Sequence, residues 1–125
     1  MAQIRVMIID DSLLFTNSLK VAIDGDANMT VVGTATNGLD GLNAIPNLKP
    51  DVIICDVQMP KMSGIEFLKA LLPKFKIPVV VISGTPGVTL SALASGAVDL
   101  IAKPSAGEAK EAFFKRVLKT VRVAA

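Results

Sequence analysis

The chain has 125 residues, 51% of them hydrophobic, and a formal net charge of +2. A chain of this size and composition can bury enough apolar surface for one folded domain and is not expected to be disordered. The small net charge and the lack of a Lys/Arg block argue against direct binding of nucleic acid, and no apolar run reaches the roughly 18 residues of a membrane span.

Apolar runs and segments of helical period alternate along the first half of the chain. The pattern predicts a strand over residues 3–9, a helix from Ser12 to Asp24 and a second strand over residues 29–35. A second helix is expected to begin near Gly38. Pro46 is expected to end or kink that helix early, because proline cannot donate a backbone hydrogen bond.

The second half continues the same alternation, with strands predicted over residues 51–56, 77–83 and 98–102. Ser63 and Glu66 form a capping box that opens a third helix, and residues 87–96 are expected to form a short, weak helix. Ser105 and Glu108 form a second capping box before the last helix. Five successive strand–helix units predict an α/β fold with a parallel sheet covered by helices on both faces.

A charged or hydroxyl-bearing residue ends or directly follows four of the five expected strands. These residues are Asp10 and Asp11 after the first strand, Asp56 at the end of the third, Ser83 at the end of the fourth and Lys103 after the fifth. In an open parallel sheet, ligands bind at the carboxyl ends of the strands. We therefore expect these side chains to gather at one edge of the sheet.

Missing residue types narrow the chemistry that this edge can perform. The chain has no His, which excludes a Ser-His-Asp triad and a His-ligated zinc site. Its single cysteine, Cys55, cannot form an internal disulfide, which favours a cytoplasmic location. Three crowded carboxylates repel one another unless a cation is present, and Mg²⁺ prefers such oxygen ligands. With Lys103 and Ser83 as partners for phosphoryl oxygens, Asp56 is a candidate acceptor in phosphoryl transfer.

The stretches "MIIDDS", "CDVQMPKMSG", "VISG" and "AKPS" resemble, in order and spacing, the response-regulator receiver domains of two-component signalling, the CheY-like domains. The resemblance covers essentially the whole chain, so residues 1–125 are interpreted as a single receiver domain. "VVGTATNGLDGL" and "SGAVDLIAKPSAG" are similar to the N-terminal receiver of the chemotaxis protein-glutamate methylesterase. The resemblance implies a flavodoxin-like (βα)₅ fold with strand order 2-1-3-4-5.

The family resemblance also implies roles for the acidic residues. Asp56 accepts a phosphoryl group from a phosphohistidine on a sensor histidine kinase. Asp11, Asp56 and the backbone carbonyl of Gln58 bind Mg²⁺ directly, and Asp10 acts through water. Such a receiver catalyses only its own phosphorylation and dephosphorylation, so it is not classed as an enzyme.

The remaining implied roles concern the phosphoryl group and the response to it. Ser83 moves toward the phosphoryl group and pulls the loop that follows, Lys103 contacts a phosphoryl oxygen, and the Lys103–Pro104 bond is cis. Apart from the resemblance, the short helix after Ser83, the fifth strand and the last helix are adjacent along one side, and the loop after Ser83 has low helix propensity. These features lead to the hypothesis that the three segments form the surface for an output domain or partner protein. Leu100 stands where many receivers carry Tyr or Phe.

Two other functions remain open on the sequence alone. One is an Mg²⁺-dependent aspartyl-phosphate hydrolase; the known haloacid-dehalogenase-like enzymes place D-x-D on the first strand, whereas this strand ends in D-D-S. The other is a scaffold that binds partners without phosphorylation. No G-x-S-x-G nucleophile motif follows the receiver-like segment, so the chain is expected to be either a stand-alone receiver or a fragment of a longer regulator, without esterase activity of its own.

Overall fold

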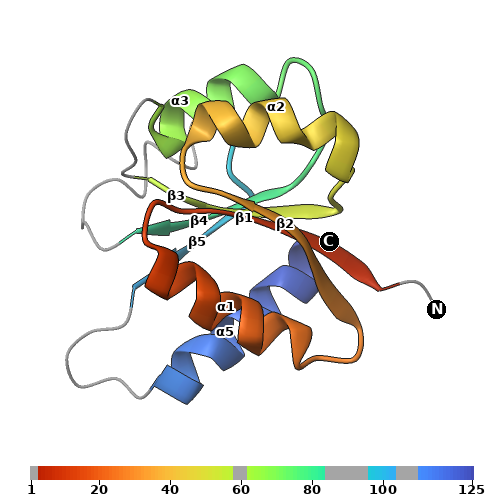
Figure 1. Ribbon diagram of the computed structural model, residues 1–125, viewed down its shortest axis with the longest axis vertical. Coiled ribbons are helices and arrows are strands. Elements are labelled where there is room, and N and C mark those ends of the chain that lie inside the picture. Colours follow the sequence, from red (N-terminus) through yellow and green to blue (C-terminus); the bar gives the residue numbers. More distant parts are fainter. Residues whose placement is uncertain (1–2, 58–61, 84–95, 104–109) are drawn as a thin grey trace.

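The computed structural model describes residues 3–57, 62–83, 96–103 and 110–125. Its helices and strands, in chain order, are β1 (Ile4–Ile9), α1 (Leu13–Asp24), β2 (Met29–Ala35), α2 (Gly38–Leu48), β3 (Val52–Asp56), α3 (Gly64–Leu71), β4 (Val79–Ser83), β5 (Asp99–Ala102) and α5 (Lys110–Ala124). The strands form one parallel sheet in the order β2-β1-β3-β4-β5. Figure 1 shows α2 and α3 over one face of this sheet and α1 and α5 over the other. The predicted α/β fold and strand order are therefore confirmed.

Two predicted features fall outside the described part of the chain. They are residues 87–95 of the expected short helix, whose last residue Gly96 is described as a turn with φ 109°, and the capping box of Ser105 and Glu108; both stay predictions. The first capping box is present: the Ser63 hydroxyl accepts from the Glu66 N–H, and the Glu66 carboxylate accepts from the Ser63 N–H.

The hydrophobic core consists of two layers, one on each face of the sheet. Along β1, Val6 and Ile8 face α1 and α5, whereas Met7 and Ile9 face α2 and α3, and all four are fully buried. Burial of each such side chain contributes roughly 1.5–3 kcal/mol relative to an exposed one. This two-sided burial explains why the strands appear in the sequence as continuous apolar runs.

Pro46 does not end α2, so the expectation of an early end was wrong. The helix continues to Leu48, and its capping residue Lys49 adopts a left-handed conformation with φ 49° and donates its N–H to Ile45 O at 2.8 Å. The Arg5 guanidinium from β1 donates to the carbonyl oxygens of Leu48, at 2.6 Å, and Lys49, at 3.2 Å. These bonds satisfy carbonyl groups that a helix end otherwise leaves to solvent, so the tertiary contact outweighs the local effect of proline.

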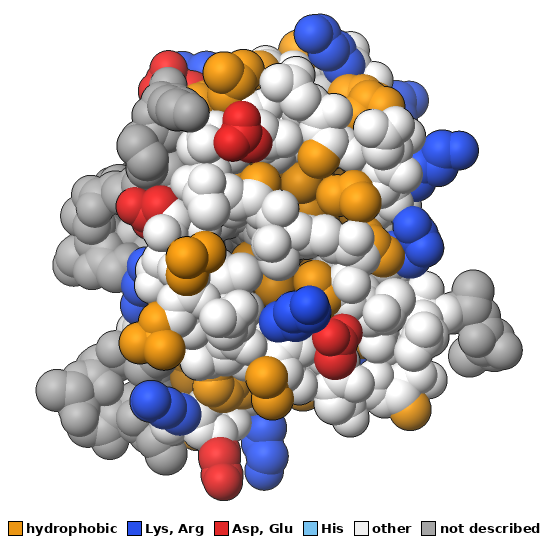
Figure 2. Space-filling model, in the orientation of Figure 1, with side chains coloured by type: hydrophobic (Ala, Val, Ile, Leu, Met, Phe, Trp, Pro, Cys, Tyr) orange, Lys and Arg blue, Asp and Glu red, His pale blue; other side chains and the backbone are white. Residues whose placement is uncertain are grey.

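The surface has an apolar area on α1, where Leu13, Leu14 and Val21 are largely exposed. Figure 2 shows hydrophobic side chains over the region of α1, with Lys and Arg side chains between them. An ion pair between Arg122 and Asp26 ties the end of α5 to the turn between α1 and β2. None of the described helices has the length and apolar character needed to cross a membrane.

Candidate functional site

The carboxyl edge of the sheet carries the candidate site. Asp10 directly follows β1, whose Ile9 pairs with Cys55 of β3, so Asp10 and Asp56 leave neighbouring strands at the same level. On the other side of β3, Ser83 pairs with Ala102, and the Lys103 N–H donates to Ser83 O at 3.0 Å. Strand register alone therefore brings four of the sequence-predicted residues to one edge.

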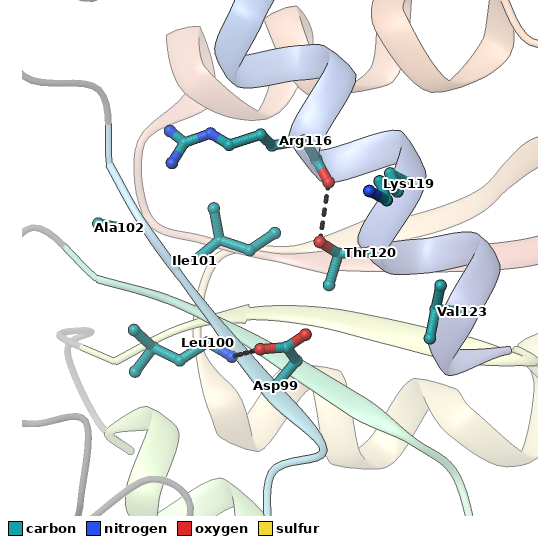
Figure 3. A pocket seen from close by; sticks show the side chains of 8 residues that line it. All are labelled: Asp99, Leu100, Ile101, Ala102, Arg116, Lys119, Thr120 and Val123. Atoms are coloured by element: carbon teal, nitrogen blue, oxygen red, sulfur yellow. Dashed lines mark hydrogen bonds between the residues drawn. The ribbon is translucent and has the colours of Figure 1, made fainter.

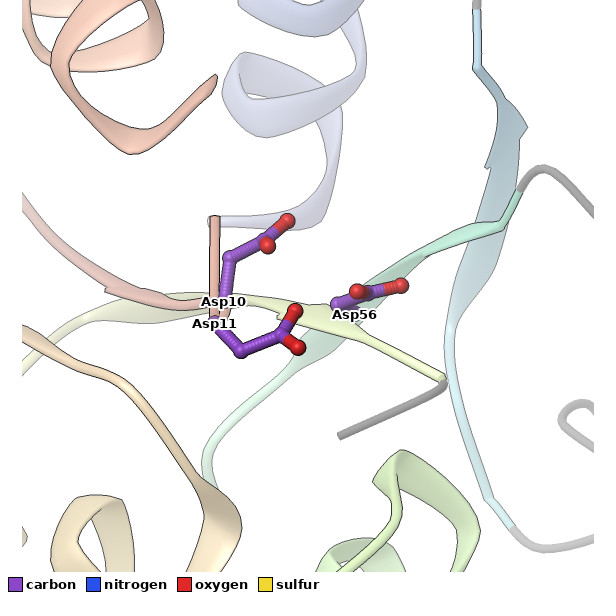
Figure 4. Close-up of side chains that lie close together, drawn as sticks. All are labelled: Asp10, Asp11 and Asp56. Carbon is purple, nitrogen blue, oxygen red and sulfur yellow. The ribbon is translucent and has the colours of Figure 1, made fainter. Parts of the chain in front are cut away.

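Three acidic side chains form a cluster at this edge (Figure 4). Asp10, Asp11 and Asp56 each place one carboxylate oxygen so that the three atoms lie within 4.8 Å of one another. Asp10 is 2% exposed and Asp56 is 5% exposed, whereas Asp11 is open to solvent. We call these three residues the acid cluster.

The environment of Asp10 opposes its negative charge. Burial raises the pKa of the Asp10 carboxyl above its ordinary value, and the nearby charges of Asp56 and Asp11 raise it further. The Ser12 N–H, which donates to Asp10 Oδ1 at 2.9 Å, and the ammonium of Lys103 act in the opposite direction. The net direction is upward, so a bound cation would stabilise the ionised form.

Lys103 provides the positive charge beside the acid cluster. Its Nζ lies 3.6 Å from Asp56 Oδ2, and its side chain is 32% exposed. The same Nζ lies 5.1 Å from the centroid of the Phe15 ring, which belongs to the first turn of α1. Ser83 is buried at the end of β4, directly beside the strand that leads to Lys103.

Two residues of the site were not assigned a role there from the sequence. Phe15 was interpreted only as an apolar residue at helical spacing. Gly64, at the start of α3, lies so close to β3 that a Cβ atom there would be 2.5 Å from Asp56 O and 2.8 Å from Val57 Cα. No local sequence pattern reveals the contact between Phe15 and Lys103, because the two residues belong to separate parts of the chain, and the run "CDVQMPKMSG" places a glycine at position 64 without showing which atoms it approaches.

Two sequence-predicted features of the site lie outside the described residues. Gln58, whose carbonyl was expected to bind the metal, belongs to the segment 58–61, and the Lys103–Pro104 bond reaches into the segment 104–109. Both stay predictions. Among the described residues, the acid cluster offers oxygen ligands only, and this donor set fits a hard divalent cation such as Mg²⁺ rather than a softer metal.

A doubly wound parallel sheet with acidic side chains and a lysine at its carboxyl edge defines the CheY-like class of α/β proteins. The sequence model of the family described as "Response regulator receiver domain" matches residues 6–114 of the chain. The chain therefore belongs to the response regulator receiver domain family, and its function is that of a receiver domain.

Individual relatives point to the chemotaxis branch of this family. The chain is 40% identical over 124 residues to protein-glutamate methylesterase/protein-glutamine glutaminase 2 of Syntrophomonas wolfei, covering 98% of this chain and 36% of that protein. It is 38% identical to the response regulator domain of Thermotoga maritima CheB, with a TM-score of 0.89 over 98% of this chain and 96% of that one. It is 25% identical to a chain of the CheX-CheY-BeF3-Mg²⁺ complex from Borrelia burgdorferi, with a TM-score of 0.82 over 98% of this chain and 89% of that one. The chain spans about a third of the length of the methylesterase relatives that it matches.

Proposed function

We propose that Asp56 accepts a phosphoryl group from a phosphohistidine of a sensor histidine kinase, and that the modified protein changes its affinity for an output domain or partner. One observation carries this proposal: the buried Asp56 carboxylate lies beside two other carboxylates and the Lys103 ammonium at the carboxyl edge of the sheet. Residues 1–125 act as one receiver domain, in the cytoplasm, and catalyse only their own phosphorylation and dephosphorylation.

In phosphoryl transfer, the protein contributes mainly by positioning the reacting groups and by offsetting the charge of the phosphoryl group. A carboxylate oxygen of Asp56 attacks the phosphorus atom, and the new O–P bond forms as the P–N bond to the donor imidazole breaks. The imidazole leaves with the electron pair and the donor nitrogen takes up a proton. The Lys103 ammonium and the Ser83 hydroxyl then face the phosphoryl oxygens, where they offset negative charge.

The acid cluster is the proposed site for Mg²⁺, with Asp11 and Asp56 as direct ligands and Asp10 acting through water. The backbone carbonyl of Gln58 is proposed as a further ligand. When bound, the ion neutralises the carboxylates and the charge of the incoming phosphoryl group. The description of the Borrelia burgdorferi complex, which contains BeF₃ and Mg²⁺ with a CheY, supports this assignment.

The output surface is proposed to include β5, α5 and the segment after Ser83. A hollow of about 330 Å³ lies between β5 and α5 and is lined by Asp99, Leu100, Ile101, Ala102, Arg116, Lys119, Thr120 and Val123 (Figure 3). Leu100 is half-buried and packs against the core on the α2 and α3 face of the sheet. A movement of β5 that follows from the Lys103 contact with a phosphoryl group would therefore reach this hollow directly.

The test of phosphorylation is chemical labelling followed by mass spectrometry. The protein is incubated with Mg²⁺ and acetyl phosphate, and one phosphoryl group is expected on Asp56. Asp56→Asn removes the acceptor and is expected to abolish labelling. Asp51→Asn is the matched control, because Asp51 directly precedes the start of β3, whereas Asp56 is at its end. An Asn at position 51 can still accept the hydrogen bond from the Arg5 N–H. Labelling at another residue, or in Asp56→Asn to the same extent, contradicts the proposal, and many turnovers on a phosphate ester point to a hydrolase.

The test of the output surface is a set of NMR spectra with and without beryllofluoride and Mg²⁺. Amide shifts are expected to change at the acid cluster and also at Leu100, Arg116 and Thr120. Changes confined to the acid cluster would show that the response does not reach β5 and α5, and the proposed surface would then be wrong.

A further inference from the structure

An aromatic ring lies beside the lysine of the proposed phosphoryl site. Lys103 Nζ is 5.1 Å from the Phe15 centroid and 3.6 Å from Asp56 Oδ2. A direct charge-assisted hydrogen bond between ammonium and carboxylate is shorter, about 2.7–2.9 Å. The ammonium therefore has both an anion and an aromatic face as neighbours, and its distance from the ring is one at which the ring quadrupole attracts a cation.

The same turn of the chain places both the ring and the acid cluster. The Ser12 N–H donates to Asp10 Oδ1 at 2.9 Å, and the Ser12 hydroxyl accepts from the Phe15 N–H at 3.3 Å. The Phe15 ring also contacts the fully buried Phe113 ring of α5, with centroids 5.9 Å apart and planes inclined by 45°. Phe15 is thus held by α1 and α5 without any contribution from Lys103.

We propose that Phe15 is a positioning residue that holds the Lys103 ammonium at the rim of the acid cluster, ready for a phosphoryl group on Asp56. The inference rests on the proposed function and adds a residue to it. A lysine side chain has a flexible four-carbon stem and loses much rotamer freedom when its end is fixed. A ring that restricts this freedom beforehand lowers the entropy cost of the contact that Lys103 makes during phosphoryl transfer.

The contact itself is tested in the resting protein by NMR. The ε-methylene protons of Lys103 are expected to be shifted upfield by the Phe15 ring current. The shift is lost in Phe15→Leu, which keeps an apolar side chain without a ring, and is kept in Phe15→Tyr. Random-coil shifts for these protons in the wild-type protein would overturn the proposal.

The catalytic consequence is tested by the rate of labelling with acetyl phosphate and Mg²⁺. Phe15→Leu is expected to lower this rate about five-fold, the size of one cation–π contact at a partly exposed site. Phe15→Tyr stays within about two-fold, and a ring-fluorinated phenylalanine, which keeps the shape but weakens the negative face, falls between them. In a Lys103→Ala background, Phe15→Leu has no further effect, because the interaction has already been removed.

Phe114→Leu is the matched control, since Phe114 packs against Phe113 in the same aromatic group but makes no ring contact with Lys103 among the described residues. Its labelling rate is expected to equal that of the wild-type protein. Equal losses in Phe15→Leu and Phe114→Leu, or a loss that persists in the Lys103→Ala background, would reduce Phe15 to a packing residue and overturn the proposal. A wild-type protein that takes up no phosphoryl group contradicts the proposed function, whereas normal labelling of Phe15→Leu contradicts the role of Phe15 alone.

Discussion

Gly64 offers a direct test of how closely the start of α3 must approach β3, the strand that ends on the proposed acceptor Asp56. A Cβ atom at position 64 would lie 2.5 Å from Asp56 O and 2.8 Å from Val57 Cα, closer than Cβ atoms come to other atoms in proteins. Both obstacles are backbone atoms, so no side-chain rotation can relieve the contact. In Gly64→Ala, the start of α3 must therefore move away from β3 by about 1 Å to restore ordinary van der Waals contact.

The expected cost follows from this displacement. Overpacking in a closely packed region costs roughly 1–3 kcal/mol. The movement also strains the hydrogen bond from the Gly64 N–H to Val57 O, now 2.7 Å long, which contributes about 1 kcal/mol. Alanine regains about 0.4–1 kcal/mol because it restricts the unfolded chain. We therefore expect Gly64→Ala to lower the free energy of unfolding by about 2 kcal/mol.

The assay is urea unfolding followed by circular dichroism, because the chain has no Trp or Tyr for fluorescence. The control is Gly25→Ala, whose Cβ would lie 3.2 Å from Val21 O and is expected to change the free energy of unfolding by less than about 0.5 kcal/mol. The labelling rate of Asp56 should fall by as much as about 100-fold, since a misplacement of 1 Å in a reacting group has effects of that size. Wild-type stability together with a wild-type labelling rate would refute the argument that close approach at Gly64 positions Asp56.

Three further predictions concern titratable groups. Asp10→Asn should raise the free energy of unfolding at pH 7 in metal-free buffer, because burial first, and then the neighbouring acids, raise the pKa of Asp10. The gain in the free energy of unfolding should shrink as the pH falls toward 3.8, the ordinary pKa of an Asp carboxyl. Urea unfolding between pH 4 and 7 measures this change. Arg122→Ala should lower the free energy of unfolding at pH 7, because the Asn28 N–H first, and then Arg122, lower the pKa of Asp26. This stabilisation is present above pH 3.8, the ordinary pKa of an Asp carboxyl, and is lost as the pH falls through the lowered pKa of Asp26. The difference between the two proteins should therefore fade in acid. Cys55 should resist iodoacetamide at pH 8 in the native protein and react in urea. The reason is that burial first, and then the charges of Asp56 and Asp10, raise the pKa of its thiol. Rapid alkylation of the native protein would contradict this prediction.

The sequence was sufficient to predict the fold and the acid cluster because both depend on simple rules. Continuous apolar strands alternating with helices specify a parallel sheet, and a parallel sheet collects the residues that end its strands at one edge. Asp10 and Asp56 are separated by 46 positions, yet the pairing of Ile9 with Cys55 brings them together. No knowledge of side-chain packing was needed for that step.

The contacts that the sequence did not reveal depend on packing between elements. Phe15 has the spacing of a core residue, and only the position of β5 shows that Lys103 lies over its ring. The expectation that Pro46 ends α2 early was wrong for the same reason, since Arg5, which supports the end of α2, belongs to another element more than forty residues away. Local propensity describes one segment, whereas these contacts need the relative placement of two.

The acid cluster itself is difficult to explain as a stabilising feature. Asp10 is buried, and its pKa is raised by burial and by the charges of Asp56 and Asp11 despite the opposing contributions of the Ser12 N–H and Lys103. An ionised Asp10 therefore destabilises the fold at neutral pH, whereas an Asn at the same position could accept the Ser12 hydrogen bond without a charge. A cluster of charges that lowers the stability of the resting protein is expected where those charges bind a ligand. A divalent cation that binds only the folded state would raise the free energy of unfolding by mass action. Addition of Mg²⁺ should accordingly raise the melting temperature of the wild-type protein more than that of Asp10→Asn, and equal shifts in the two proteins would exclude Asp10 from the cation site.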